Sequence, residues 1–181
     1  MPEENRVYLD EFGSNLGMTP THARSLEGKR VYCKRRANCG GNISVVACMR
    51  LGEKVISYPF DGAVDGDRFL SFLEEKVLKI LKPGDFLILD NVRFHHIEAV
   101  RVTLATVGAK PLFLPPYTPE LNPIEEAFSL IKGTLKRLEA RTISTYVDAL
   151  EIGRALVTPE KIRGYFDHAN SFLQKSSYGQ L

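Results

Sequence analysis

The chain has 181 residues, of which 44% are hydrophobic and 25% are charged, and its formal net charge is +2. A chain of this length is typical of one domain that buries roughly 70% of its unfolded surface. No apolar run approaches the ~20 residues that a membrane-spanning helix needs, and the N-terminal sequence has no signal-peptide pattern. Cys33, Cys39 and Cys48 lack the paired spacing of zinc ligands and fit reduced thiols. We therefore expect a cytoplasmic protein with no membrane partner.

The first third of the chain predicts β-strands. Short segments rich in strand-forming residues are separated by glycine-containing breaks that resemble hairpin turns. The expected strands cover residues 6–13, 30–36, 43–50 and 54–60. Four strands in succession indicate an antiparallel meander.

The rest of the chain alternates helices with strands. Apolar residues at helical spacing predict a helix over 67–81, and the continuous apolar run DFLILDN at 85–91 predicts a central strand covered on both faces. The further expected elements are a helix at about 96–107, a strand at 110–116, and helices from 122, at 145–156 and at 159–172. Strands followed by helix–strand alternation indicate an α/β fold with a mixed sheet, in one domain over 1–181.

Basic residues gather in two groups that could contact phosphates or form a solvated surface. The first lies within 28–36 and contains Lys29, Arg30, Lys34, Arg35 and Arg36. The second contains Lys132, Lys136, Arg137 and Arg141.

Three acidic residues stand at the ends of predicted elements. Asp10 and Asp90 end strands, and Glu125 begins a helix. If these carboxylates converge, each pair at ~4 Å repels by about 4 kcal/mol at an effective dielectric near 20. A divalent cation removes that repulsion, and oxygen ligands favour Mg²⁺ or Mn²⁺ over zinc. Two such ions are the usual arrangement for phosphodiester cleavage.

The proline-rich segment LPPYTPELNPIEE, at 114–126, allows two interpretations of Glu125. Asn122 is a favoured N-cap and Pro123 suits the first helical position, so Glu125 falls where it completes a capping box. Alternatively, the prolines fix the direction of this carboxylate because it binds a metal ion. The two interpretations do not exclude each other.

Three motifs resemble a known family. LDE (9–11), LDNVRFH (89–95) and LPPYTPELNPIEEAF (114–128) are similar to the signatures of DDE transposases of the mariner superfamily, most closely its bacterial insertion-sequence branch. The 34 residues between Asp90 and Glu125 match the superfamily's spacing. The resemblance covers essentially the whole chain. It implies a ribonuclease H-like fold: a mixed five-stranded sheet, its first three strands antiparallel, with helices on both faces. That is one strand fewer than the pattern predicts, so either 30–36 or 54–60 is expected to be irregular.

The resemblance also implies a set of site residues. Asp10, Asp90 and Glu125 match the family's metal-binding catalytic triad, which holds Mg²⁺, with Mn²⁺ as a substitute, in two ions. Strand alternation directs Glu11 away from Asp10. The family's auxiliary position falls on Asn91. The expected DNA contacts are His95, Lys132, Lys136 and the basic residues of 28–36.

The implied function is that of a transposase acting on double-stranded DNA. It would hydrolyse a strand at each element end and transfer the freed 3′-hydroxyl into target DNA, as a homodimer assembled on DNA and associated with the nucleoid. The chain would be a single DDE catalytic domain with about 145–181 as a helical extension. Relatives carry N-terminal helix-turn-helix modules, and this pattern starts one strand before Asp10, so a separate helix-turn-helix polypeptide is an expected partner. The alternatives are a non-catalytic DNA-binding or assembly remnant, and a general ribonuclease H or junction-resolving nuclease.

Overall fold

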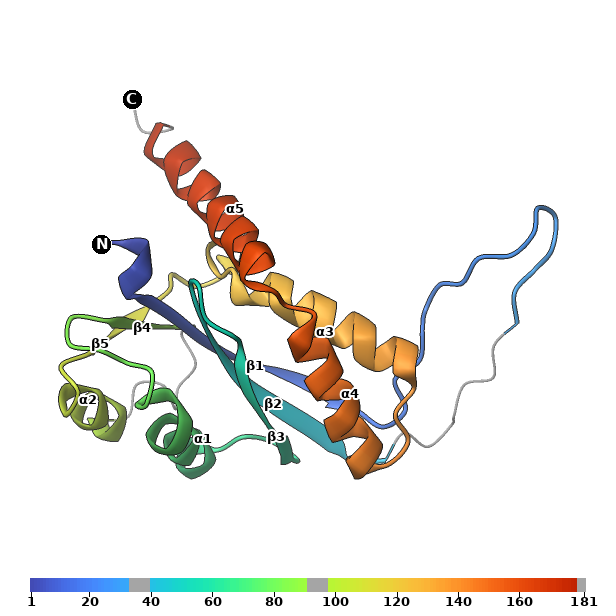
Figure 1. Ribbon diagram of the computed structural model, residues 1–181, viewed down its shortest axis with the longest axis horizontal. Coiled ribbons are helices and arrows are strands. Elements are labelled where there is room, and N and C mark those ends of the chain that lie inside the picture. Colours follow the sequence, from blue (N-terminus) through green and yellow to red (C-terminus); the bar gives the residue numbers. More distant parts are fainter. Residues whose placement is uncertain (33–39, 91–97, 179–181) are drawn as a thin grey trace.

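The fold is organised around a mixed five-stranded β-sheet (Figure 1). The computed structural model describes residues 1–32, 40–90 and 98–178, with side chains as far as residue 172. The strands are β1 (Arg6–Asn15), β2 (Asn42–Arg50), β3 (Ile56–Asp61), β4 (Phe86–Leu89) and β5 (Lys110–Phe113). Their order in the sheet is β3-β2-β1-β4-β5. The pairs β1–β2 and β2–β3 are antiparallel, whereas β4 runs parallel to β1, and β5 to β4.

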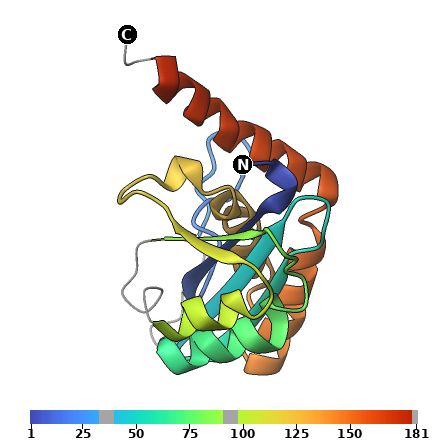
Figure 2. The same ribbon diagram turned by 90° about the vertical axis from the view of Figure 1, so that its left-hand side faces the viewer.

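Helices cover both faces of this sheet (Figures 1 and 2). One face carries α1 (Gly66–Phe72), the π-helical segment η2 (Leu73–Val77) and α2 (Glu98–Ala105). The other face carries α3 (Ile124–Leu138), α4 (Ile143–Ala155) and α5 (Pro159–Tyr178). Two short 3₁₀ helices, η1 (Glu3–Asn5) and η4 (Pro119–Leu121), precede β1 and α3. The prediction of a mixed five-stranded sheet with helices on both faces is confirmed.

The central strand β1 shows why the sheet needs a cover on both sides. Successive side chains of a strand point to opposite faces. Accordingly, Tyr8 and Phe12 belong to the buried cluster under α3–α5, while Val7 and Leu9 belong to the cluster under α1 and α2. Asp10 has the same parity as Tyr8 and Phe12, so it faces α3.

The predicted helices form with small shifts at their ends. The helix expected over 67–81 is α-helical only to residue 72 and continues as η2, where the Leu78 N–H donates to the Leu73 carbonyl, an i to i+5 bond of 2.9 Å. The apolar stripe still faces the core, because Phe69, Leu73 and Val77 are buried. No helix in the described part of the chain is long and apolar enough to cross a membrane.

The strand expected at 30–36 is wrong over its described part. Residues 30–32 belong to no strand, and 33–36 lie outside the described residues. The cause is exposure: Val31 is 43% exposed and Tyr32 is 83% exposed, so little apolar burial stabilises a strand there. Instead, residues 16–32 form an extended arm that leaves the body after β1 (blue in Figure 1). The strand expected at 54–60 is β3.

The base of the arm is held by Arg141, between α3 and α4. Its guanidinium donates to the carbonyls of Leu16 at 3.1 Å and Met18 at 3.0 Å, and it pairs with Glu139 at 2.6 Å. Arg141 was a candidate for phosphate contact in the second basic group. These bonds to the main chain give it a structural role.

Candidate metal-dependent active site

The register of two parallel strands brings Asp10 and Asp90 to the same level of the sheet. Leu9 in β1 pairs with Leu89 in β4, so the next residue on each strand is an aspartate. Neighbouring strands lie about 4.8 Å apart. The prediction that Asp10 ends a strand is wrong, because β1 continues to Asn15 and Asp10 lies in its middle. Asp10 is directly beside the position where β4 ends and Asp90 follows.

Glu125 reaches this place through the proline-rich connection from β5 to α3. The Leu114 N–H donates to the Leu89 carbonyl at 2.8 Å, which continues the sheet for one residue beyond β5. The chain then turns back: Thr118 Oγ1 donates to the Pro115 carbonyl at 2.6 Å. Prolines fix the backbone φ angle, so this segment delivers Glu125 in the first turn of α3 with little freedom.

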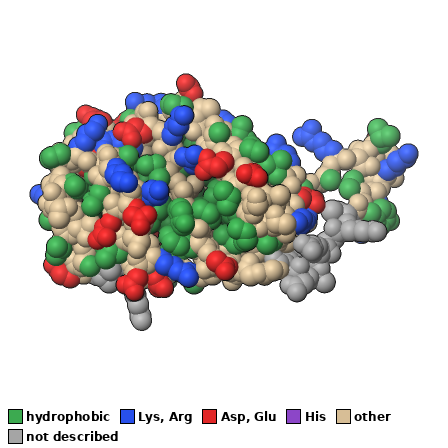
Figure 3. Space-filling view, turned by 60° about the horizontal axis from the view of Figure 1, so that its bottom comes forward, with side chains coloured by type: hydrophobic (Ala, Val, Ile, Leu, Met, Phe, Trp, Pro, Cys, Tyr) green, Lys and Arg blue, Asp and Glu red, His purple; other side chains and the backbone are tan. Residues whose placement is uncertain are grey.

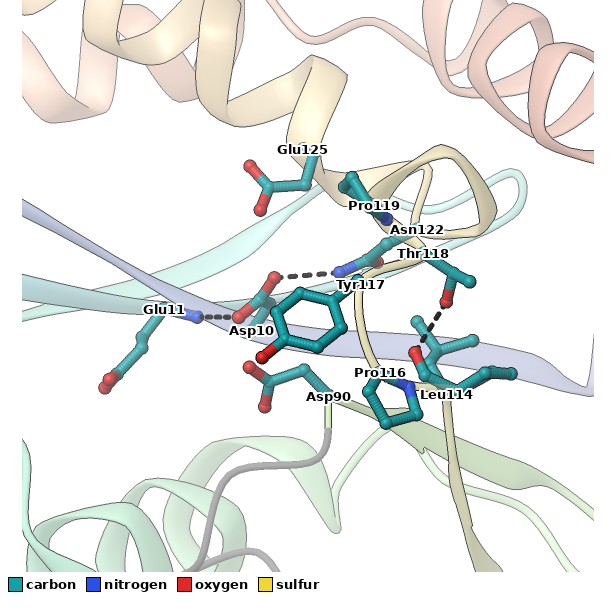
Figure 4. A pocket seen from close by; sticks show the side chains of 11 residues that line it. Asp10, Glu11, Asp90, Leu114, Pro116, Tyr117, Thr118, Pro119, Asn122 and Glu125 are labelled. Carbon is teal, nitrogen blue, oxygen red and sulfur yellow. Dashed lines mark hydrogen bonds between the residues drawn. The ribbon is translucent and has the colours of Figure 1, made fainter.

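The three carboxylates line one cavity of about 530 Å³. Figure 4 shows Asp10 between the other two, with Glu125 on the α3 side and Asp90 on the β4 side. The remaining wall consists of Glu11, Asn122 and the segment 114–119. Asp10 is buried, Asp90 is half-buried and Glu125 is exposed, so the acidic wall opens to solvent. Figure 4 also shows the Glu11 side chain pointing away from Asp10, as strand alternation predicts.

Asp10 is held by hydrogen bonds to both of its carboxylate oxygens. Oδ1 accepts from the backbone N–H of Glu11 at 2.7 Å, and Oδ2 accepts from the side-chain amide of Asn122 at 2.8 Å. The capping box is therefore wrong, because the Asn122 side chain bonds to Asp10 and caps no helix. The main-chain carbonyl of Asn122 accepts the Glu125 N–H at 3.1 Å instead. Helix α3 begins at Ile124, with Pro123 already in helical conformation.

The carboxylates share a cavity without closing around a single point. Within residues 1–32, 40–90 and 98–178, no group of three His, Cys, Asp or Glu side chains has the geometry to hold one metal ion. Mg²⁺ usually keeps several waters and binds proteins through only one or two carboxylates. The donor set of hard oxygens, with Asp10 in the middle, suits cations held by pairs of carboxylates.

The sequence matches a family model that spans most of the chain. Residues 5–146 match the model described as "DDE superfamily endonuclease". The chain belongs to this family. The matched range contains Asp10, Asp90 and Glu125 and extends into α4. No curated protein matches the sequence.

The fold of the chain is similar to solved structures of the Mos1 mariner transposase. The Mos1 strand transfer complex has a TM-score of 0.72 at 20% identity, over 96% of this chain and 53% of that one. The Mos1 paired-end complex with Mn has a TM-score of 0.67 at 14% identity, over 95% and 53%. The Mos1 catalytic domain has a TM-score of 0.64 at 16% identity, over 92% and 76%. The likeness shows a ribonuclease H-like fold, and the chain spans about half the length of the first two structures.

The other predicted site residues fall in different places of the chain. Asn91, His95, Lys34, Arg35 and Arg36 lie outside the described residues. Lys29 and Arg30 are exposed on the arm and line no part of the acidic cavity. The two lysines of α3 are half-buried on the helix that carries Glu125, with Lys132 Nζ 5.0 Å from the centroid of the Phe12 ring.

Two residues of the cavity wall were missed by sequence reasoning. Asn122 reads locally as a helix cap, and only its position three residues before Glu125 hinted at the site. Tyr117 has a φ of 59°, which is rare for a bulky residue, and its side chain is 99% exposed at the cavity. Gly and Asn are the residues that most often signal a positive φ, and position 117 holds neither.

Cys48 has no place in the site. It is fully buried in β2, and burial raises the pKa of its thiol to about 12. It therefore stays protonated at neutral pH.

Proposed function

We propose that this chain is the catalytic domain of a transposase from the bacterial insertion-sequence branch of the mariner superfamily. It would hydrolyse one DNA strand at each end of a mobile element and transfer the freed 3′-hydroxyl into target DNA. The observation that carries the proposal is the convergence of Asp10, Asp90 and Glu125, from three separate elements, on one open cavity. In this proposal residues 1–181 form one catalytic unit, with about 145–181 as its helical extension.

The proposed cofactor is Mg²⁺, with Mn²⁺ as a substitute, in two ions. Asp10, Asp90 and Glu125 would hold these ions, with Asp10 lying between the other two carboxylates (Figure 4). The bound cations would activate the attacking hydroxyl and stabilise the leaving oxygen. The similar Mos1 paired-end complex with Mn supports the choice of a divalent cation.

The proposed role of each of the three carboxylates follows from the way the fold holds it. Asp10 is fixed by two hydrogen bonds in the middle of β1, so it supplies a rigid carboxylate. Asp90 and Glu125 stand at the ends of elements that enter the cavity from opposite sides. The half-open cavity leaves room for a phosphodiester above the acidic wall.

The proposed DNA contacts extend from the cavity along α3. Lys132 and Lys136 follow Glu125 by about two and three helical turns. Phe12 and Phe128 lie beneath the Lys132 ammonium, which restricts its position. Lys136 lines a second cavity, of about 440 Å³, beside the start of the arm. Further proposed contacts are His95 and the first basic group, and Asn91 is proposed as an auxiliary site residue.

The proposed partners are the DNA of the element ends and of the target. The similar Mos1 structures include a paired-end complex and a strand transfer complex, which supports this substrate class. Recognition of the terminal repeats is assigned to a helix-turn-helix module outside these 181 residues, and the active form to a homodimer on DNA.

The deciding test is Mn²⁺-dependent nicking of supercoiled plasmid. We expect the wild type to nick, and Asp90→Asn to fall to the level of the metal-free reaction, because the substitution removes a charged metal ligand. Glu120→Gln is the matched control. It removes a carboxylate from η4, in the same segment of chain as Glu125, but Glu120 lines no part of the cavity. This variant should nick like the wild type.

A second readout is the melting temperature with and without Mn²⁺. Ligand binding to the folded state raises it, so the shift should be larger for the wild type and Glu120→Gln than for Asp90→Asn. Equal shifts in all three proteins, or nicking that survives Asp90→Asn, would contradict the proposed site.

A further inference from the structure

The side chain of Asn122 is a buried polar group whose position needs an explanation. Asn122 is 7% exposed, and its backbone is extended where η4 ends, shortly before α3. Burying an amide costs free energy unless it forms hydrogen bonds. Its Nδ2 donates to Asp10 Oδ2 at 2.8 Å, across 112 residues of sequence. Figure 4 shows this bond crossing from the proline-rich segment to β1.

Asn122 is connected to Glu125 as well. Its main-chain carbonyl accepts the Glu125 N–H at 3.1 Å, and its own N–H donates to the Pro119 carbonyl at 3.0 Å. The main chain of Asn122 is thus fixed by the start of α3, while its side chain holds Asp10. One residue therefore links the orientation of Asp10 to the position of Glu125.

We propose that Asn122 is a positioning residue that orients the Asp10 carboxylate for a divalent cation. The assignment rests on the proposed function of the cavity. Groups that hydrogen-bond to metal ligands fix the ligand's orientation, and their loss typically lowers metal affinity 10–100-fold. A carboxylate has about four lone-pair sites, so the bonds from Glu11 and Asn122 are compatible with cation binding by Asp10.

A purely structural role does not account for the amide. The hydrogen bonds at the start of α3 use the main chain of Asn122, which any residue except proline supplies in full. The side chain caps no helix N–H, and its bond goes to an acidic residue of the cavity wall. The amide is therefore explained by Asp10 and not by the helix.

The test compares Mn²⁺ affinity of Asn122→Ala and Asn122→Leu with that of the wild type. Free Mn²⁺ is measured by electron paramagnetic resonance during titration of the full chain without DNA, so the readout does not depend on cleavage. Leu keeps the branched shape of Asn with a somewhat larger volume and Ala removes the branch, while both lack the donor. We expect affinity to fall about 10-fold or more in both variants.

The matched control is Glu120→Gln. Glu120 lies in η4, in the same segment of chain, but lines no part of the cavity. Its Mn²⁺ affinity should stay within about twofold of the wild type. A loss equal to that of the Asn122 variants would overturn the assignment in favour of a general effect of changes in this segment.

The remaining outcomes separate this inference from the proposed function. Wild-type binding with unchanged affinity in both Asn122 variants would overturn the positioning role alone. Absence of Mn²⁺ binding by the wild type would overturn the metal site and the positioning role together. Loss of the folded circular dichroism spectrum in both variants would assign Asn122 to the fold instead.

Discussion

At the scale of single residues, the backbone conformation of Tyr117 costs free energy that side-chain packing does not offset. Its φ of 59° places a bulky residue in the left-handed region, and its side chain is almost fully exposed. Such conformations cost of order 1 kcal/mol and gather at functional sites. Asn tolerates this region better, so Tyr117→Asn should raise the free energy of unfolding by about 0.5–1 kcal/mol. Urea unfolding measures the change.

The control for Tyr117 is Tyr32→Asn. Tyr32 is 83% exposed on the arm and has no positive φ, so its replacement should leave the free energy of unfolding unchanged. If Tyr117→Asn is no more stable than the wild type, the ring of Tyr117 makes a stabilising contact that offsets the backbone cost.

Residues also mark the limit of what the sequence could predict about the site. Asp90 was identifiable as an acid at a strand end, whereas Asp10 was predicted at a strand end and lies in mid-β1. The structure places both at the cavity with Glu125. The role of Asn122 was not identifiable, because its partner is 112 residues away and its neighbours Pro123 and Glu125 complete a convincing local cap. The Asn122 side chain could cap the helix or bond to Asp10, and in the structure it bonds to Asp10.

At the scale of elements, the two ends of β4 have different roles. Asp90 follows its last residue, beside Asp10 in mid-β1, and a buried ion pair closes the other end, where β2 ends and β4 begins. Arg50 Nη1 donates to Asp85 Oδ2 at 2.5 Å and Nη2 donates to Oδ1 at 3.2 Å. Arg50 also donates to the carbonyls of Ile80 and Glu4. This arginine therefore ties β2, η1 and the loop before β4 together.

Breaking the ion pair between Arg50 and Asp85 should destabilise the protein strongly. Asp85→Asn leaves the Arg50 charge buried and uncompensated, which should lower the free energy of unfolding by about 3–5 kcal/mol. Glu53→Gln is the control: Glu53 lies 3.9 Å from Arg50 and is partly exposed, so its loss should cost no more than about 1 kcal/mol. Chemical denaturation of both variants tests this. Similar small losses in both would show that the buried pair is dispensable.

Elements were easier to predict than their pairing. The stripe containing Phe69 and Val77 identified a helix because its apolar period survives the widened π turn. The described part of segment 30–36, residues 30–32, has strand-forming side chains, but Val31 and Tyr32 are exposed and form no strand. Neither the parallel pairing of β1 with β4, about 80 residues apart, nor the sheet order follows from periodicity, since both depend on contacts between distant segments. The family resemblance implied five strands with the first three antiparallel, and the structure adds the sheet order and the pairing of β1 with β4.

At the scale of the whole molecule, several basic residues lie on the projecting arm, apart from the acidic cavity of the body. The net charge is only +2, yet Arg24, Lys29 and Arg30 lie on an arm that extends from the body. Figure 3 shows Lys and Arg side chains on this projecting part, apart from those on the body. The acidic cavity belongs to the body. A DNA duplex that reaches the cavity would therefore gain its basic contacts from different parts of the surface.

The arm makes a prediction about DNA affinity that does not require cleavage. Each phosphate contact that is lost lowers the slope of log affinity against log salt by about 0.9 for duplex DNA. If Lys29 and Arg30 each contact a phosphate, the double variant to alanine should reduce the slope by about 2. Fluorescence anisotropy with a labelled duplex, over a range of salt concentrations, measures the slope.

The control is the double alanine variant of Lys76, in η2, and Lys79, just after it. Both lysines are exposed on the other face of the sheet from α3, and their loss changes the net charge equally. An equal slope change in both double variants would show that net charge matters and the arm does not. A change confined to Lys29 and Arg30 would place the duplex against the arm.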